Sequence, residues 1–290
     1  MSASDPFVNT LRKFYNDVGD KYDRGQMGEW HQKAADILVD ASGSSVKEGS
    51  WVLDLATGTG NVAFAAAAKV GPSGQVLGID ISENFLEHAK STATELGLDT
   101  FVEFINQDVT HLSLPSKYSG HRPFDAAFCG SAVMLFPDSV AIVRKVATEL
   151  LKPGGIFVAD THGSIPGAVF FDIVRSKGIE TVLDPAWGTQ PGETLRRVFE
   201  DSGMIVKEII SNPRSTGIVK WDVRTPEARN TLWENTIIKA PWVSFGMKIS
   251  AEELAELKST WEEGIMARAQ SDGFIHDDIM HYVAVSKTKN

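Results

Sequence analysis

The chain has 290 residues, of which 42% are hydrophobic, enough for one large globular domain or for one domain with a cap. Its formal net charge of -10 argues against a nucleic acid or an anionic membrane as a partner. A single cysteine, Cys129, excludes an intrachain disulfide and a cysteine-clustered zinc site, and it predicts a reducing compartment, the cytoplasm. We see no secretory signal and no apolar segment long enough to span a bilayer, so no membrane partner is expected.

Two helices are predicted before the first strand. The first helix has one apolar face, which consists of Phe7, Leu11, Phe14, Tyr15 and Val18. The second helix covers residues 28–42. We expect residues 1–45 to form an N-terminal helical lid segment.

A glycine-rich turn follows the first predicted strand, an apolar run that begins at Trp51 and ends in a carboxylate, Asp54. The turn contains Gly58 and Gly60, which let the backbone approach a ligand closely. A second apolar run, residues 75–80, ends in Asp80, a carboxylate that can hold the two hydroxyls of a ribose. These segments predict a cofactor that contains adenosine.

Two cofactor classes fit this geometry. The stretch from Gly58 to Ala63 has the G-x-G-x-x-A form of a dinucleotide fingerprint, so this segment alone leaves NAD open. S-adenosylmethionine carries no phosphate, and its site tolerates acidic residues such as Asp54 around the loop. Asp54 has a second interpretation, in which it only orients the loop backbone.

Further strands and helices alternate after Asp80. Ser82 is the predicted N-cap of the next helix, and strands are expected at residues 101–106, 124–130 and 156–160. Asp108 follows the third strand and can accept from an adenine amino group, while Val109 packs on the ring. Gly130 ends the fourth strand. Alternation of this kind predicts a parallel sheet that binds its ligand at the carboxyl ends of the strands.

The chain resembles the class I S-adenosylmethionine-dependent methyltransferases, and within them the ubiquinone/menaquinone-biosynthesis type. The resemblance covers residues 12–162 well and the last third in outline. It rests on the segments 18–23, 52–60, 78–82, 107–109 and 151–155. Ala56 and Thr57 depart from the Gly-Cys pair common in the superfamily, which leaves the turn possible.

The resemblance implies an α/β fold: a Rossmann-like sheet of seven mostly parallel strands with the last antiparallel, helices on both faces and a helical cap. It implies S-adenosyl-L-methionine as the cofactor, and Tyr22 near its carboxylate or sulfonium. The expected cofactor-binding residues are Tyr22, Asp54, Ala56, Gly58, Gly60, Asp80, Ile81, Asp108, Val109 and Gly130. We expect a core at residues 46–221, a cap insertion at 222–276 and a final core strand at 277–290.

The last third is expected to be mainly helical between its strands. A helix at 192–202 precedes a strand at 204–210, and a strand at 281–286 is inserted between strands five and six if the resemblance holds. Ser250 to Glu253 form a capping box for a helix that buries Trp261. Some of four other tryptophans are expected to line an apolar substrate pocket: Trp187, Trp221, Trp233 and Trp242.

Methyl transfer needs alignment of the acceptor with the donor and, for some acceptors, a general base. His162, just after the fifth strand, is the first candidate for this base, and His31 in the N-terminal segment is the second. A hydrogen-bonded or solvated side chain is the alternative interpretation of either histidine.

The acceptor is deduced partly by exclusion. Cys129 and Gly130 stand where methyltransferases acting on adenine or glutamine carry Asn/Asp-Pro-Pro-Tyr/Phe, and they give no acidic ligand for magnesium, so no metal site is expected. None of the four tyrosines is followed by Lys four positions later, which argues against a short-chain dehydrogenase. A small organic acceptor remains, such as an aromatic, quinone or polyketide-like product of small-molecule biosynthesis, methylated on carbon, oxygen or nitrogen. Two alternatives stay open: a non-methyl-transfer reaction on the same fold, and a non-catalytic partner subunit.

Overall fold

The computed structural model describes residues 5–19, 22, 25–118, 123–213, 218–239, 247 and 249–289. The chain divides into two compact units. The first unit contains residues 1–10, 162–194 and 211–282, and the second contains 11–161, 195–210 and 283–290.

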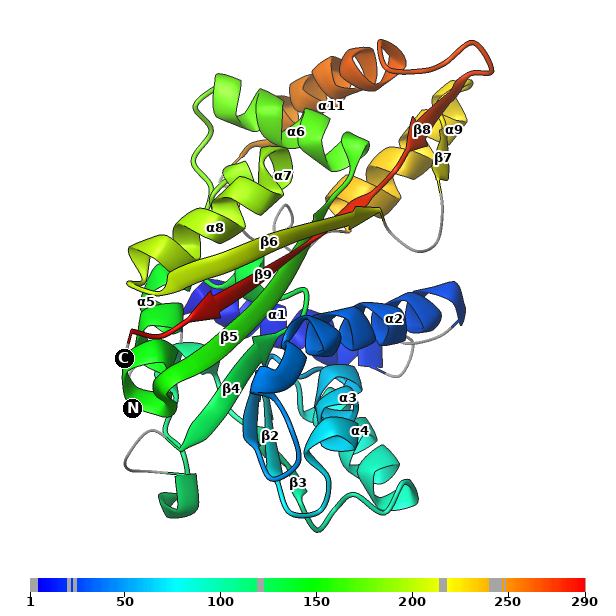
Figure 1. Ribbon diagram of the computed structural model, residues 1–290. Coiled ribbons are helices and arrows are strands. Elements are labelled where there is room, and N and C mark those ends of the chain that lie inside the picture. The colour runs from blue at the N-terminus through cyan, green and yellow to red at the C-terminus, as the bar shows by residue number, and fades with distance from the viewer. Residues whose placement is uncertain are drawn as a thin grey trace. The chain divides into compact units, whose positions relative to one another are not determined.

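Seven strands form one sheet in the order β3-β2-β1-β4-β5-β9-β6, with β9 antiparallel (Figure 1). This confirms the predicted fold class, including the last strand between strands five and six. The strands are β1 Trp51–Leu55, β2 Gln75–Asp80, β3 Val102–Asn106, β4 Phe124–Cys129, β5 Leu151–Gly163, β6 Ile205–Pro213 and β9 Met280–Lys287.

The main helices of the described residues are α1 Pro6–Val18, α2 Gly25–Ala41, α3 Asn61–Val70, α4 Glu83–Glu95, α5 Ser139–Lys145, α6 Ile165–Ser176, α7 Ala186–Thr189, α8 Pro191–Asp201, α9 Pro226–Trp233 and α11 Ala251–Met266. Ser82 caps α4 by accepting from the Phe85 N–H, and Ser250 forms its predicted capping box with Glu253. Within the described residues, no helix combines the length and the apolar character that a membrane crossing requires.

The core of the second unit explains why its strand ends coincide. β1 lies between β2 and β4, and Leu53 is in register with Leu77 on one side and Ala127 on the other. All but the first residue of β1 and of β2 are buried, as parallel strands covered on both faces require. This register brings the ends of β1, β2 and β4 to one edge of the sheet.

β5 begins earlier than the sequence predicts. The fifth strand was expected to begin at residue 156, but β5 already pairs at Leu151 with Phe124 of β4. The pairing shifts before Ile156, and Gly154 has a φ of 76°. An irregularity therefore accommodates the glycines within the strand instead of ending it.

The first unit has an aromatic core of its own. Trp261 is fully buried, donates from Nε1 to the Pro166 carbonyl at 2.9 Å, and packs edge-on against Trp233 with ring centroids 5.1 Å apart. Two strands that the sequence analysis missed, β7 Val219–Asp222 and β8 Phe274–Asp277, pair antiparallel in this unit. About 50 residues of chain separate them, so no local pattern indicates that they pair.

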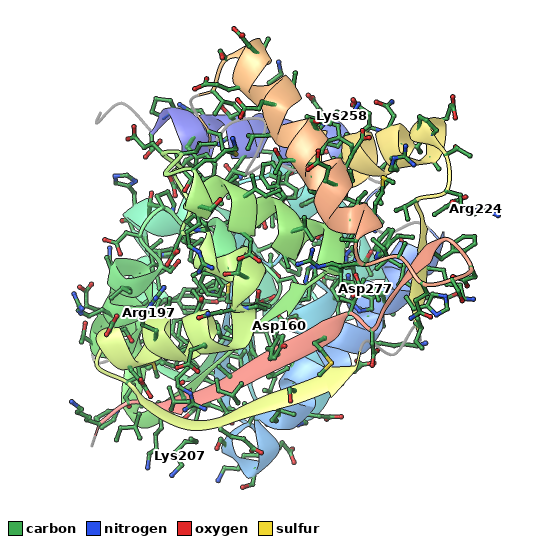
Figure 2. The ribbon with its side chains drawn as sticks, turned by 90° about the horizontal axis from the view of Figure 1, so that it is seen from above. Asp160, Arg197, Lys207, Arg224, Lys258 and Asp277 are labelled. Carbon is green, nitrogen blue, oxygen red and sulfur yellow. The ribbon has the colours of Figure 1, made fainter. Side chains whose placement is uncertain are left out.

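The carboxylate of Asp277, at the end of β8, is buried in the first unit (Figure 2). Its Oδ2 accepts from the Ile165 N–H at 2.8 Å, at the start of α6, and from Trp221 Nε1 at 2.9 Å. Burial raises the pKa of Asp277, and the bond from the Trp221 indole opposes that effect.

Candidate cofactor site

A cavity opens at the ends of β1, β4 and β5 in the second unit. It encloses about 500 Å³ of empty space, part of it open to solvent. The lining residues come from the N-terminal segment, from the loop after β1 and from the ends of β4 and β5. They are Tyr22, His31, Ala34, Ala35, Leu38, Asp54, Ala56, Thr57, Gly58, Thr59, Asn61, Val62, Gly130, Ser131 and Asp160.

Asp54 presents a buried carboxylate to this cavity. Its Oδ2 accepts from the Thr57 hydroxyl at 2.5 Å, whereas its buried Oδ1 makes no hydrogen bond of ordinary geometry with any described residue. Burial raises the pKa of Asp54 to about 7; the Thr57 bond lowers it and the charge of Asp80 raises it further. An atom of this kind is suited to accept from a ligand.

Asp80 holds the glycine loop from the neighbouring strand. Its Oδ2 accepts from the Gly58 N–H at 2.8 Å and its Oδ1 from the Ser82 N–H at 2.8 Å. Burial raises the pKa of Asp80 to about 6, and the two backbone bonds oppose that effect. Each carboxylate oxygen has a second lone pair, so these bonds leave Asp80 able to accept from ribose hydroxyls.

The loop requires close backbone packing. A Cβ atom at Gly78 would lie 2.6 Å from the Phe104 ring and 2.9 Å from the Thr57 hydroxyl. Gly60, with a φ of 97°, has no room for one either, because the Phe64 ring would be 2.8 Å away. A larger residue at either position would clash with these side chains, so only glycine fits there.

Two residues of the cavity wall that are not glycine have left-handed backbones. Ala56 has a φ of 52° and Ser131 a φ of 51°, and they follow β1 and β4. Strain of this kind persists where the surrounding structure enforces it, most often at functional sites.

We predict that Ala56→Gly raises the free energy of unfolding by about 0.5–1 kcal/mol, because glycine adopts this φ without strain. Denaturant titration measures the effect. The control is Ala66→Gly in the middle of the buried face of α3, which should lower stability by about 1 kcal/mol. A loss of stability in Ala56→Gly similar to that of the control would contradict the assignment of strain.

Aromatic and polar contacts join the N-terminal segment to the turn after β2 and to the start of α4. The Tyr22 ring stacks on His31 with centroids 4.4 Å apart and an interplanar angle of 15°, and it lies 5.0 Å from the Phe85 ring. Asn16 of α1 accepts from the Ser82 hydroxyl at 2.8 Å, and its backbone carbonyl accepts from Asn84 Nδ2 at 2.9 Å. The segment is thereby fixed to the turn that carries Asp80.

Gly60 and Asp80 lie outside the cavity lining, and so do the other predicted cofactor residues, Asp108, Val109 and Ile81. Asp108 is the N-cap of a short helix, and its Oδ1 accepts from the Thr110 N–H at 2.8 Å and from the Thr110 hydroxyl at 2.7 Å. Val109 beside it is buried, and Ile81 is half-buried next to Asp80. Their contacts with a cofactor stay predictions.

Several predicted residues belong to the first unit. His162 is the first residue of its segment 162–194 and lies within β5, not after this strand as was predicted. Trp187, Trp221 and Trp233 also lie in this unit, with Trp233 only 2% exposed in the aromatic core. Trp242 lies outside the described residues. The predicted catalytic and substrate-binding roles of these residues stay predictions.

The cavity also includes residues that the sequence analysis did not select as site residues. Asp160, three residues before the end of β5, accepts from the Ser131 N–H at 2.5 Å and from the Ser131 hydroxyl at 3.3 Å. Thr57 belongs to the loop itself, and Asn61 is the first residue of α3. A carboxylate at a strand end could have indicated Asp160; no sequence signal marks Ser131, because its backbone conformation depends on that contact.

A family model described as a methyltransferase domain matches residues 46–200, which is more than half of the chain. The chain belongs to this methyltransferase family. The predicted resemblance to class I S-adenosylmethionine-dependent methyltransferases is therefore confirmed, and the matched residues contain the glycine loop, Asp80, Asp108 and Asp160.

Curated relatives of this methyltransferase include two demethylmenaquinone methyltransferases. The one from Lactococcus lactis is 29% identical over 165 residues, which are 54% of this chain and 60% of that relative. The one from Staphylococcus aureus is 27% identical over 219 residues, or 67% of this chain and 85% of the relative.

Solved structures share the fold at lower identity. The geranyl diphosphate C-methyltransferase of Streptomyces coelicolor, solved with S-adenosyl-L-homocysteine, is 13% identical with a TM-score of 0.58, and the match covers all of both chains. The [4+2]-cyclase SpnF is 19% identical with a TM-score of 0.52, over 98% of this chain and 93% of that one.

Proposed function

We propose that this chain transfers the methyl group of S-adenosyl-L-methionine to a small organic acceptor. The observation that carries the proposal is the cavity in which the glycine loop, two buried carboxylates and a histidine converge. The sulfonium of that cofactor supplies a methyl group already activated for in-line displacement.

The residues of the cavity fit this donor better than a dinucleotide. A pyrophosphate would face Asp54 and Asp160, and two buried carboxylates repel an anion in a medium of low dielectric constant. An amino-acid ammonium, in contrast, would satisfy the unbonded Oδ1 of Asp54.

The predicted residues would divide the recognition of the cofactor among them. Asp80 accepts from the ribose hydroxyls, Asp108 accepts from the adenine amino group, and Val109 and Ile81 pack on the adenine ring. The loop from Ala56 to Gly60, with Gly130, brings backbone close to the amino-acid part, and Tyr22 covers it. His31, which lines the cavity, or His162 takes a proton from acceptors that must lose one.

The relatives act on demethylmenaquinone by name, which supports a quinone-like or other aromatic acceptor for this chain. Trp187, Trp221, Trp233 and Trp242 are the proposed apolar wall for such a ring. We propose the cytoplasm as its location and small-molecule biosynthesis as its role.

The direct test incubates the purified protein with labelled cofactor and a panel of naphthoquinols, phenolic polyketides and amines. Formation of S-adenosyl-L-homocysteine together with a labelled acceptor supports methyl transfer. A chemically changed acceptor that carries no label supports the alternative of a different reaction on this fold. SpnF, which shares the fold, is named as a [4+2]-cyclase. Tight cofactor binding with no change in any acceptor supports a partner subunit.

The general base is tested by two substitutions. His31→Ala and His162→Ala are expected to differ in turnover. The variant that loses the base should retain cofactor affinity within about threefold while its turnover falls about 100-fold or more. Single-turnover kinetics and calorimetry measure the two quantities. If both variants turn over at the wild-type rate, neither histidine is the base.

A further inference from the structure

Thr57 lies two residues after β1 and bonds to Asp54 through its side chain. Its hydroxyl donates to Asp54 Oδ2 at 2.5 Å, and both residues are buried, with Asp54 0% and Thr57 7% exposed. Both line the cavity. The buried Oδ1 of the same carboxylate makes no hydrogen bond of ordinary geometry with any described residue. One oxygen of Asp54 is therefore engaged by the protein, and the other is left for a ligand.

β2 fixes Thr57 where its hydroxyl reaches Asp54. The Thr57 N–H donates to the Ile79 carbonyl at 2.9 Å, and the Thr57 carbonyl accepts from the Gly60 N–H at 3.0 Å. A Cβ atom at Gly78 would lie only 2.9 Å from the Thr57 hydroxyl, so glycine in β2 leaves the room that this hydroxyl occupies. The branched Cβ of threonine also restricts its χ1 angle. The bond to Asp54 is thus set by the fold.

Asp54 and Asp80 are held in different ways. Each oxygen of Asp80 accepts a backbone N–H, which fixes the glycine loop and the turn after β2. Asp54 accepts its hydrogen bond from a side chain, and the Ala63 N–H near the start of α3 lowers its pKa as well, by less than the Thr57 hydroxyl does. A hydrogen bond donated to a carboxylate favours its charged form. The loop backbone is thus held by Asp80, whereas the Thr57 hydroxyl stabilises the charge of Asp54.

The other groups around Asp54 oppose its charge or lie across the cavity from no particular partner of it. Burial raises the pKa of Asp54 most, and the charge of Asp80 at the end of β2 raises it further. In β4, burial and then the charge of Asp54 raise the pKa of the Cys129 thiol. Asp160 of β5 and His31 of α2 line the same cavity, and among the described lining residues His31 is the one that can carry a positive charge. The Thr57 hydroxyl is therefore the contact that most favours a charged Asp54.

We propose that Thr57 is a positioning residue of the cofactor site, whose hydroxyl holds Asp54 as a carboxylate with Oδ1 left to accept from the amino-acid ammonium of the ligand. The inference rests on the proposed function. Thr57 acts through Asp54 and not by touching the ligand. Without the hydroxyl, Asp54 takes up a proton at a higher pH, and a neutral carboxyl binds an ammonium less strongly than a carboxylate does.

Calorimetric binding of two ligands tests the role of this hydroxyl without turnover. S-adenosyl-L-homocysteine carries the amino-acid ammonium, and 5′-methylthioadenosine is a related nucleoside thioether that lacks the amino acid. Thr57→Val replaces the hydroxyl by a methyl group of similar size. At pH 6.5 this variant should bind S-adenosyl-L-homocysteine about five- to tenfold more weakly than the wild type, and 5′-methylthioadenosine within about twofold of it. At pH 9 the loss should shrink to about twofold or less, because Asp54 is then ionised in both proteins.

Two further variants serve as controls. Thr57→Ser keeps the donor and should bind S-adenosyl-L-homocysteine within about threefold of the wild type at pH 6.5. Thr288→Val is the matched control outside the cavity lining. Thr288 is 4% exposed, and its hydroxyl donates to the Lys152 carbonyl at 2.9 Å, near the start of β5. This variant loses a buried hydroxyl of the same kind and should keep the wild-type affinity for both ligands at both pH values.

Four results would overturn the inference. They are unchanged affinity in Thr57→Val at pH 6.5, equal weakening of both ligands, a loss of the same size at pH 6.5 and pH 9, and a loss that Thr57→Ser shares. If Thr57→Val does not fold, Thr57→Cys takes its place, since a thiol fills the same site and is a weak donor, and the same results are expected of it. Failure of the wild type to bind either ligand would instead overturn the proposed function.

Discussion

Asp80→Ala is expected to weaken binding of S-adenosyl-L-methionine by roughly 5- to 150-fold, equal to about 1–3 kcal/mol. The substitution removes the acceptor proposed for the ribose hydroxyls. It also removes the acceptor of the Gly58 and Ser82 N–H groups, which lie 2.8 Å from the carboxylate oxygens. Because Gly58 is in the loop that lines the cavity, the geometry of the amino-acid part of the site should loosen as well. Isothermal titration calorimetry measures the affinity.

Part of that effect is a loss of fold stability, and a second variant separates it. Ser82→Ala removes the cap of α4 in the same turn, where the Ser82 hydroxyl accepts from the Phe85 N–H, and it removes the bond from that hydroxyl to Asn16, but it leaves the carboxylate and the bond from Asn84 Nδ2 to the Asn16 carbonyl. We expect it to lower the free energy of unfolding by about 1 kcal/mol and to leave cofactor affinity within about threefold. Equal loss of affinity in the two variants would mean that Asp80 acts only through the turn.

Cofactor affinity is expected to fall by about tenfold or more between pH 7.5 and pH 5.5. The pKa of Asp54 is raised to about 7, mainly by burial, so in the ligand-free protein its carboxyl takes up a proton as the pH falls through that value. A cationic ligand favours the ionised form, and binding below pH 7 must then release the proton. Asp80, with a pKa of about 6, shifts affinity in the same direction. Within this range the ligand amino group stays mostly protonated.

The measurement compares calorimetric heats in buffers of different ionisation enthalpy. At pH 6.5, roughly one proton should be released per ligand bound, and Asp54→Asn should abolish most of that release. If Asp54 is already ionised in the ligand-free protein, the wild type and Asp54→Asn should release the same number of protons at pH 6.5, and that result would refute the prediction.

The raised pKa of Asp54 has the opposite effect on the stability of the ligand-free protein, which should fall as the pH rises. The folded-state pKa of Asp54, about 7, lies above the ordinary aspartate value of 3.8, so the folded state holds the proton more tightly than the unfolded state. This contribution is fully present below about pH 4 and is lost as the pH rises through 7, by up to roughly 4 kcal/mol. The carboxylate that favours the cofactor therefore destabilises the ligand-free fold.

The loop and its acidic partners could be predicted because their signals are local. Buried parallel strands appear in the sequence as continuous apolar runs; Asp80 is the last residue of β2, and Asp54 comes one residue before the end of β1. The need for glycine at residue 60 is also visible in the sequence, whereas the reason is not: the ring of Phe64, from the following helix, occupies the space of a Cβ.

What the sequence determined by itself is the order of strands and helices up to Asp160, the caps at Ser82 and Ser250, and the edge of the sheet at which the acidic residues lie. Only the tertiary structure brought Asp160 to Ser131, left one oxygen of Asp54 without a hydrogen bond, and paired β7 with β8. The physical reason is the range of the forces. Strand and helix patterns follow from burial along neighbouring residues, whereas a carboxylate's pKa and partners depend on groups that the fold brings together from separate strands.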